Sequence, residues 1–161
     1  MSNLTNGIDI TLVSGALTTA GAETVYDTTV AITALIDGKF NTVATITDGA
    51  TPTTDGNTGS AFTPVLPDQI SVFVWGVDAS DTVTLYQGTV TDVDGDTDTP
   101  IDYPTFPVLP AGVAPFGYTI MQTDGTSAAA GLRPGTDNWN ATGLTVTTVN
   151  CGALPSRPVI S

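Results

Sequence analysis

One stretch of the chain is apolar on both of its faces: Gln69-Ile70-Ser71-Val72-Phe73-Val74-Trp75. In an extended strand, successive side chains point to opposite faces, so Ile70, Val72 and Val74 share one face while the two aromatic residues share the other. A strand of this kind has to be covered on both sides. The cover is either two further layers of the same chain or a contact with another subunit, and the sequence leaves both open.

The neighbouring segments favour antiparallel strands. Residues 30–36 and 40–47 flank Asp37-Gly38, and an Asp-Gly pair supplies the positive φ angles that a two-residue hairpin loop needs. Apolar and polar side chains alternate over 82–90, which is the pattern of a strand with one face in water. We expect a short connection between this strand and the stretch that begins at Gln69. Further strands are expected at 8–13, 117–122 and 144–149.

The composition favours strands and turns over helices. The chain is rich in Thr and has 17 Gly and 11 Pro among its 161 residues, whereas good helix formers never gather in a long run. Residues 127–132 are the one stretch that could form a helical turn. These features predict an all-β fold, an antiparallel β-sandwich with a jelly-roll-like or small-barrel arrangement and negligible helix.

The length suits a single β domain over residues 1–161. Within it we expect an extended N-terminal segment over 1–25. Residues 48–61 are rich in Thr, Gly, Asp and Pro and offer almost nothing to bury. This stretch is expected to be an exposed, mobile loop.

The charge excludes several classes of partner. Sixteen Asp and Glu against three Lys and Arg give a formal net charge of −13 at pH 7. Such a chain repels a phosphate backbone, so we expect no nucleic-acid partner. No apolar stretch approaches the roughly 20 residues needed to span a bilayer, so we expect no membrane partner. The opening residues lack the positive charge of a secretory signal, and the single thiol of Cys151 cannot form an intrachain disulfide. Both features fit assembly in a reducing cytosol.

The residue types leave little for catalysis. Because the chain has no His, a nucleophilic triad built on His is impossible. Glu23 is the single glutamate, and it lies in a Gly/Ala/Thr stretch with no pattern of burial that would tune it as an acid or base. Lys39 follows the predicted tight turn and is expected to be exposed. We therefore expect no enzymatic activity.

Four alternating carboxylates, Asp92, Asp94, Asp96 and Asp98, resemble a calcium loop at first sight. Hard cations favour this density of carboxylate oxygens. An EF-hand register that starts at Asp92 puts Thr97 where Gly is required and Tyr103 where a bidentate Glu belongs, so the motif fails. We interpret the run as a solvated acidic loop and expect no cofactor, with a weak Ca²⁺ or Mg²⁺ site as the alternative.

The aromatic residues allow two interpretations. Flat aromatic side chains on β-sandwiches can bind sugars by stacking, although packing in a core or an interface is their commoner use. The candidates for such a sugar-binding platform are Trp75, Trp139, Tyr103, Tyr118 and Phe116.

Several short motifs follow one another in the C-terminal half. Leu-Pro-Ala-Gly at 109–112 precedes Pro-Phe-Gly-Tyr at 115–118, Pro-Gly-Thr at 134–136 leads to a Thr/Val strand at 143–147, and Leu-Pro-Ser-Arg-Pro stands at 154–158. In this order they resemble tailed-phage virion proteins, a loosely defined group of capsid decoration (cement) and head-fibre proteins. The Ile-Asp-Gly-Lys turn at 36–39 and the strand pair at 72–88 are similar to the N-terminal portion of that group, whose glycine turn is replaced here by Asp-Ala-Ser-Asp at 78–81.

The resemblance implies a non-enzymatic structural protein that decorates the outer capsid surface of the virion and is made in the host cytoplasm during assembly. Its implied partners are the major capsid protein and further copies of itself, as a homotrimer that stabilises contacts between major capsid subunits. A head-fibre or host-surface module that binds glycans through an exposed aromatic such as Trp139 is one alternative. A tail or baseplate component is another.

The contact surface of such a protein is expected to lie where apolar or Pro-rich elements have no partner in the chain. The strand that begins at Gln69 and the segment 103–110 meet this description, and two cations could add single contacts. The residues predicted for the interface are Ile70, Val72, Phe73, Val74, Trp75, Tyr103, Phe106, Arg133 and Arg157.

Overall fold

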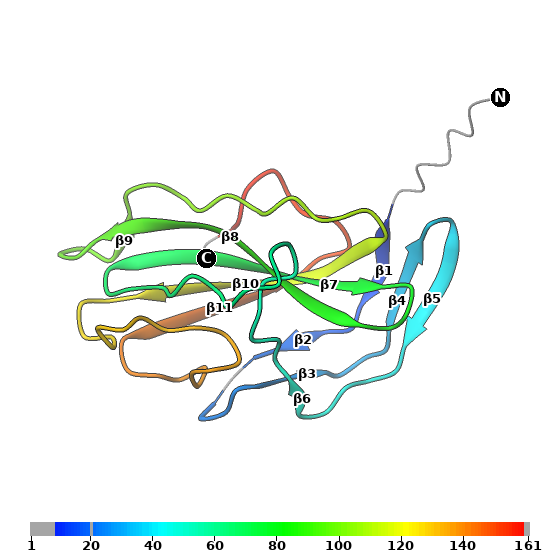
Figure 1. Ribbon diagram of the computed structural model, residues 1–161, viewed down its shortest axis with the longest axis horizontal. Helices are drawn as coiled ribbons and strands as arrows, with labels where there is room; N and C mark the ends of the chain where they lie inside the picture. Colours follow the sequence, from blue (N-terminus) through cyan, green and yellow to red (C-terminus); the bar gives the residue numbers. More distant parts are fainter. Residues whose placement is uncertain (1–8, 20, 160–161) are drawn as a thin grey trace.

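The computed structural model describes residues 9–19 and 21–159, and this part of the chain is built from antiparallel β-strands with no helix (Figure 1). The prediction of an all-β antiparallel fold is confirmed, and the arrangement is that of a β-sandwich or small barrel. The strands are β1 (Ile10–Ser14), β2 (Leu17–Thr18), β3 (Val25–Thr28), β4 (Ile32–Ile36), β5 (Lys39–Val43), β6 (Gly49–Ala50), β7 (Gln69–Asp78), β8 (Val83–Asp94), β9 (Thr99–Pro100), β10 (Val113–Thr123) and β11 (Leu144–Asn150).

The strands form three sheets around the long strand β7. The largest sheet has the order β11-β10-β7-β8-β9, and two smaller sheets have the orders β1-β4-β5 and β2-β3-β6. β7 therefore lies between β10 and β8, in the middle of this sheet.

The predicted hairpin at Asp37-Gly38 is present. β4 pairs with β5 in a register that sets Ile36 opposite Lys39, so the two residues between them form the whole loop. Asp37 has φ 49° and Gly38 has φ 74°, as a primed two-residue turn requires. The local sequence thus determines the register between β4 and β5.

The two faces of the five-stranded sheet are buried in two separate cores. The inner core lies between this sheet and the two smaller sheets, and it holds Phe73, Trp75 and Val77 of β7. The outer core lies on the opposite face and holds Ile70, Val72 and Val74. The division matches the alternation expected from the sequence.

Within residues 9–19 and 21–159, irregular segments rather than a regular sheet cover the outer core. Figure 1 shows the segment that follows β9 and the segment that follows β11 running over this face. The half-buried side chains that pack against the outer core from these segments and the adjoining strands are Phe106, Leu109, Val113, Val149, Cys151 and Leu154.

Two expectations about turns and loops need correction. Residues 127–132 form turns rather than a helical turn, and Leu132 pairs with Val65 in an isolated bridge. The stretch 48–61 is exposed at 56–61, but Thr51 and Asp55 are buried. Asp55 is anchored to β8, because its Oδ1 accepts a hydrogen bond of 3.0 Å from the backbone N–H of Gln87.

The expected N-terminal segment 1–25 is only partly an extended arm. Its residues 10–14 and 17–18 form β1 and β2, which pair with β4 and β3. Leu17 is buried in the inner core. Residues 1–8 and 20 lie outside the described residues.

Candidate interaction surface

The predicted contact strand is not available to a partner. The side chains of Ile70, Val72, Phe73, Val74 and Trp75 are all 0 % exposed within the chain itself. The chain supplies both covering layers, so the first of the two alternatives left open by the sequence holds. The assignment of these five residues to an interface is wrong because both faces of β7 are already covered.

The aromatic platform is also corrected. Trp139 is 4 % exposed, and its Nε1 donates a hydrogen bond of 2.7 Å to the carbonyl oxygen of Val25. Trp75, Tyr118 and Phe116 are buried as well, so these rings are unavailable for stacking against a sugar. They are core residues, which leaves Tyr103 as the exposed member of the predicted platform.

The remaining predicted interface residues do not form one surface. Tyr103 is half exposed, and the Arg157 guanidinium carbon lies 5.7 Å from the centroid of its ring. Phe106 packs edge-on against Tyr118 with 5.0 Å between ring centroids. Arg133 is half-buried, and its Nε donates a hydrogen bond of 3.0 Å to the carbonyl oxygen of Phe62. Tyr103 and Arg157 are brought together, whereas Arg133 is occupied by the loop that carries Phe62.

The acidic run belongs to the β8–β9 hairpin. Asp92 and Asp94 end β8, and Asp96 and Asp98 lie in the turn before β9. Asp94 Oδ1 accepts a hydrogen bond of 2.9 Å from the backbone N–H of Asp96, and Asp92 Oδ1 accepts one of 3.1 Å from Gln69 Nε2. Among residues 9–19 and 21–159, no group of three or more His, Cys, Asp or Glu is placed to hold a metal ion.

An exposed apolar row lies on the outward face of the sheet β1-β4-β5. Leu35 of β4 pairs with Ile10 of β1 and with Phe40 of β5, and paired residues point to the same face. Phe40 is 76 % exposed, while Ile10 and Leu35 are half-buried. Sequence reasoning missed this row, although the two-residue turn alone sets Phe40 opposite Leu35. We call Ile10, Leu35 and Phe40 the Phe40 row.

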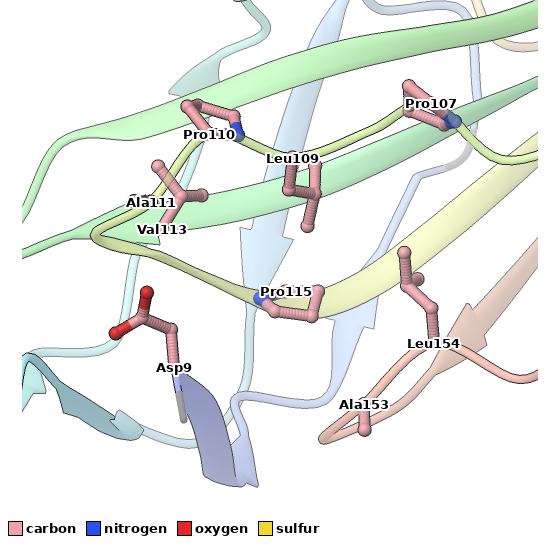
Figure 2. Close-up of a pocket in the computed structure, with 9 residues that line it drawn as sticks. All are labelled: Asp9, Pro107, Leu109, Pro110, Ala111, Val113, Pro115, Ala153 and Leu154. Carbon is pink, nitrogen blue, oxygen red and sulfur yellow. The ribbon is translucent and has the colours of Figure 1, made fainter. Parts of the chain in front are cut away.

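A groove opens on the outer side of the five-stranded sheet (Figure 2). It has a volume of about 380 Å³. Leu109 and Leu154 point into it from the two covering segments, and Pro115 of β10 lies beside them. The residues that line it are Asp9, Pro107, Leu109, Pro110, Ala111, Val113, Pro115, Ala153 and Leu154.

Asp9 closes one end of the groove. Its Oδ1 accepts a hydrogen bond of 3.0 Å from the backbone N–H of Asp37, and its Oδ2 accepts one of 2.8 Å from the backbone N–H of Gly112. The carboxylate therefore ties the start of β1 to the β4–β5 turn and to the start of β10. Cys151 lies two residues before the groove residue Ala153, and burial raises the pKa of its thiol to about 11, which disfavours the reactive thiolate.

No family model, no curated protein and no solved structure matches this chain. In the part that the structure describes, no helix has the length and apolar character needed to cross a membrane. The residues themselves therefore carry any argument about function.

Proposed function

We propose that the chain is a non-enzymatic virion protein of a tailed phage that decorates the outer capsid surface and stabilises contacts between major capsid subunits. The motifs in the C-terminal half support this proposal by resemblance. The observation that carries it is the Phe40 row, because a large aromatic side chain that is 76 % exposed on a sheet face is suited to contact with another protein.

Binding at this face would act through burial of apolar surface. Covering the Phe40 side chain contributes about 2 kcal/mol, which corresponds to roughly 30-fold in affinity. A specific contact needs about 1,000 Å² in total, so the row would be the centre of a larger interface that includes the exposed Val13 beside it on the same sheet. Summed over many copies on a shell, the binding free energy of these contacts would have to be overcome before the shell ruptures.

The proposal includes self-association as a homotrimer. Each copy carries a formal charge of −13, so copies repel one another and their association strengthens as salt screens the repulsion. Sedimentation of the purified chain at low and high salt measures this directly. A chain that stays monomeric at every concentration and salt would contradict the trimer.

The direct test is to add the purified chain to capsids stripped of decoration. We expect the chain to cosediment with the shells and to raise the temperature at which they rupture. The Phe40→Ser variant should bind roughly 30-fold more weakly than the unmodified chain. Ile101→Ser is the matched control. It removes an apolar side chain that is 66 % exposed and that follows β9, away from the Phe40 row.

Failure of the unmodified chain to bind shells, or binding to tails alone, would contradict the proposal. Equal binding of the Phe40→Ser variant would contradict the role given to the Phe40 row. A glycan-binding role through Trp139 has lost its structural basis, because that ring is buried.

A further inference from the structure

The groove on the outer face is walled by aliphatic and proline side chains from three separate parts of the chain. Pro107, Leu109 and Pro110 come from the segment after β9, Pro115 comes from β10, and Leu154 comes from the segment after β11 (Figure 2). Prolines have little side-chain freedom, so these walls lose little conformational entropy when a ligand binds. The volume of about 380 Å³ is at the small end of the range for ligand pockets and accommodates one or two side chains of a partner.

Carboxylates gather at one end of this groove. Asp9 lines it and bonds the backbone of Gly112, and a Cβ built on Gly112 would lie 3.6 Å from Asp37 Oδ2. Asp78 is the register partner of Val113, which also lines the groove, so both side chains point to the outer face. We call Asp9, Asp37 and Asp78 the acidic rim.

The cations of the chain do little to offset this rim. Arg133 is bonded to the carbonyl oxygen of Phe62, and Arg157 lies over the ring of Tyr103. Lys39 shares the β4–β5 hairpin with Asp37 and offsets one of the three charges. The rim thus keeps a negative potential beside an apolar groove.

We propose that the groove binds a basic segment of another protein, with an aliphatic side chain in the groove and flanking Lys or Arg side chains on the acidic rim. This inference rests on the proposed function, and it assigns the segment to the protein that the chain decorates. A second copy of this chain is the wrong occupant of the groove, because its three cations, Lys39, Arg133 and Arg157, stand far apart in the sequence and supply no basic segment. Charge complementarity selects a basic partner instead.

The arrangement gives each feature a separate role. The groove supplies affinity through burial of one aliphatic side chain, and the rim selects for positive charge and speeds the encounter. Binding at the groove should therefore weaken as salt rises. The opposite salt dependence is expected of self-association, so the two contacts can be told apart.

The test uses two short capped peptides, one with a single leucine flanked by lysines and one with the same leucine flanked by glutamates. Each is titrated into the isotopically labelled full chain and followed by nuclear magnetic resonance. We expect the lysine peptide to shift the signals of Leu109, Ala111, Val113 and Leu154, and the glutamate peptide to leave them unchanged. Equal binding of both peptides, shifts that map elsewhere, or no binding of the lysine peptide would overturn the proposal.

Variants sharpen the result. Ala153→Trp places a large ring in the groove from an exposed wall position and should weaken the lysine peptide by about tenfold or more. Asp37→Asn removes one rim charge, keeps a residue that tolerates positive φ, and should weaken binding a few-fold. The matched controls are Ala129→Trp and Asp96→Asn, which make the same changes at exposed turn positions away from the groove, and both should bind as the unmodified chain does.

Stripped capsids then separate this inference from the proposed function. If the unmodified chain and the Ala153→Trp variant bind shells equally well, the groove is not the docking site, although the decoration proposal stands. If neither binds shells while the lysine peptide still occupies the groove, the decoration proposal fails and the groove still has its ligand class. If the unmodified chain binds shells and the Ala153→Trp variant does not, the result supports both the decoration proposal and the groove as the docking site.

Discussion

The two faces of the five-stranded sheet are covered in different ways. Strands of the two smaller sheets close the inner face, where Trp75 packs at 4.7 Å from Tyr26 and 6.5 Å from Trp139, measured between ring centroids. Irregular segments close the outer face, and their backbones touch the sheet at few places, such as Thr89 N–H to the Thr105 carbonyl at 3.2 Å. Apolar contact is enough to cover a sheet, and the irregular cover is what leaves a groove.

The largest expected effect is on the inner face. Trp75→Ala removes a fully buried ring whose Nε1 donates a hydrogen bond of 2.9 Å to Thr119 Oγ1, so it should lower the free energy of unfolding by about 4 kcal/mol. Denaturant unfolding measures this, with Trp75→Phe as the milder variant. A loss below 1 kcal/mol for Trp75→Ala would contradict the view that the inner core dominates stability.

The outer cover depends on one close approach to β8. A Cβ on Gly88 would overlap the carbonyl oxygen of Thr105, so Gly88→Ala should push the 103–110 segment away and cost about 2 kcal/mol. Gly125→Ala is the matched control, because its Cβ would make contacts of 3.5 Å or longer and its φ is not positive. Equal stability of the two variants would show that the segment does not rest on β8 as described.

A smaller effect is expected where the second covering segment packs. Leu154 is half-buried against the outer core, so Leu154→Ala should cost about 1 kcal/mol. Leu12→Ala removes the same atoms from a side chain that is 55 % exposed on β1 and should change the free energy of unfolding little. Hydrogen exchange should show the amide of Cys151, which donates to the Phe116 carbonyl, opening faster in the Leu154→Ala variant.

The last effect is absent at neutral pH, and it concerns the thiol under the outer cover. Burial raises the pKa of Cys151 from 9.0 to about 11, so the unfolded chain loses this proton at lower pH than the folded chain. Its contribution to stability is fully present below pH 9 and is lost as the pH rises from 9 to 11. Unfolding of the Cys151→Ser variant should lack this part of the alkaline decline, and rapid alkylation of the native thiol near neutral pH would contradict its burial.

Local patterns in the sequence predicted much of the fold. The alternation in β7 gave the two faces, and Asp37-Gly38 gave the hairpin and its register, because both depend on neighbouring residues alone. The burial of Trp139 depends on the carbonyl of Val25, and that of Asp55 depends on Gln87, so pairings distant in the chain decide both. These could not be predicted from local composition, which marked 48–61 as a loop.

Of the two candidate surfaces, one depends on a local pattern in the sequence and the other on segments that are distant in the chain. The pairing of Phe40 with Leu35 follows from the hairpin register, so this part of the Phe40 row could have been predicted from the sequence. The groove was not, because three irregular or strand-end segments meet to form it and no periodic pattern governs where they lie. The interface assigned to β7 failed because two apolar faces can be covered within one chain as well as between chains.

We propose that this chain acts through contact surfaces on the sheet β1-β4-β5 and on the outer face of the five-stranded sheet. The most direct measurement is hydroxyl-radical footprinting of the chain free in solution and bound to capsids. We expect Phe40 and the groove residues Leu109 and Leu154 to be oxidised less in the bound state, while Ile101, which is 66 % exposed, reacts equally in both. Bound chains in which Phe40 and both leucines react as they do in solution would contradict the claim.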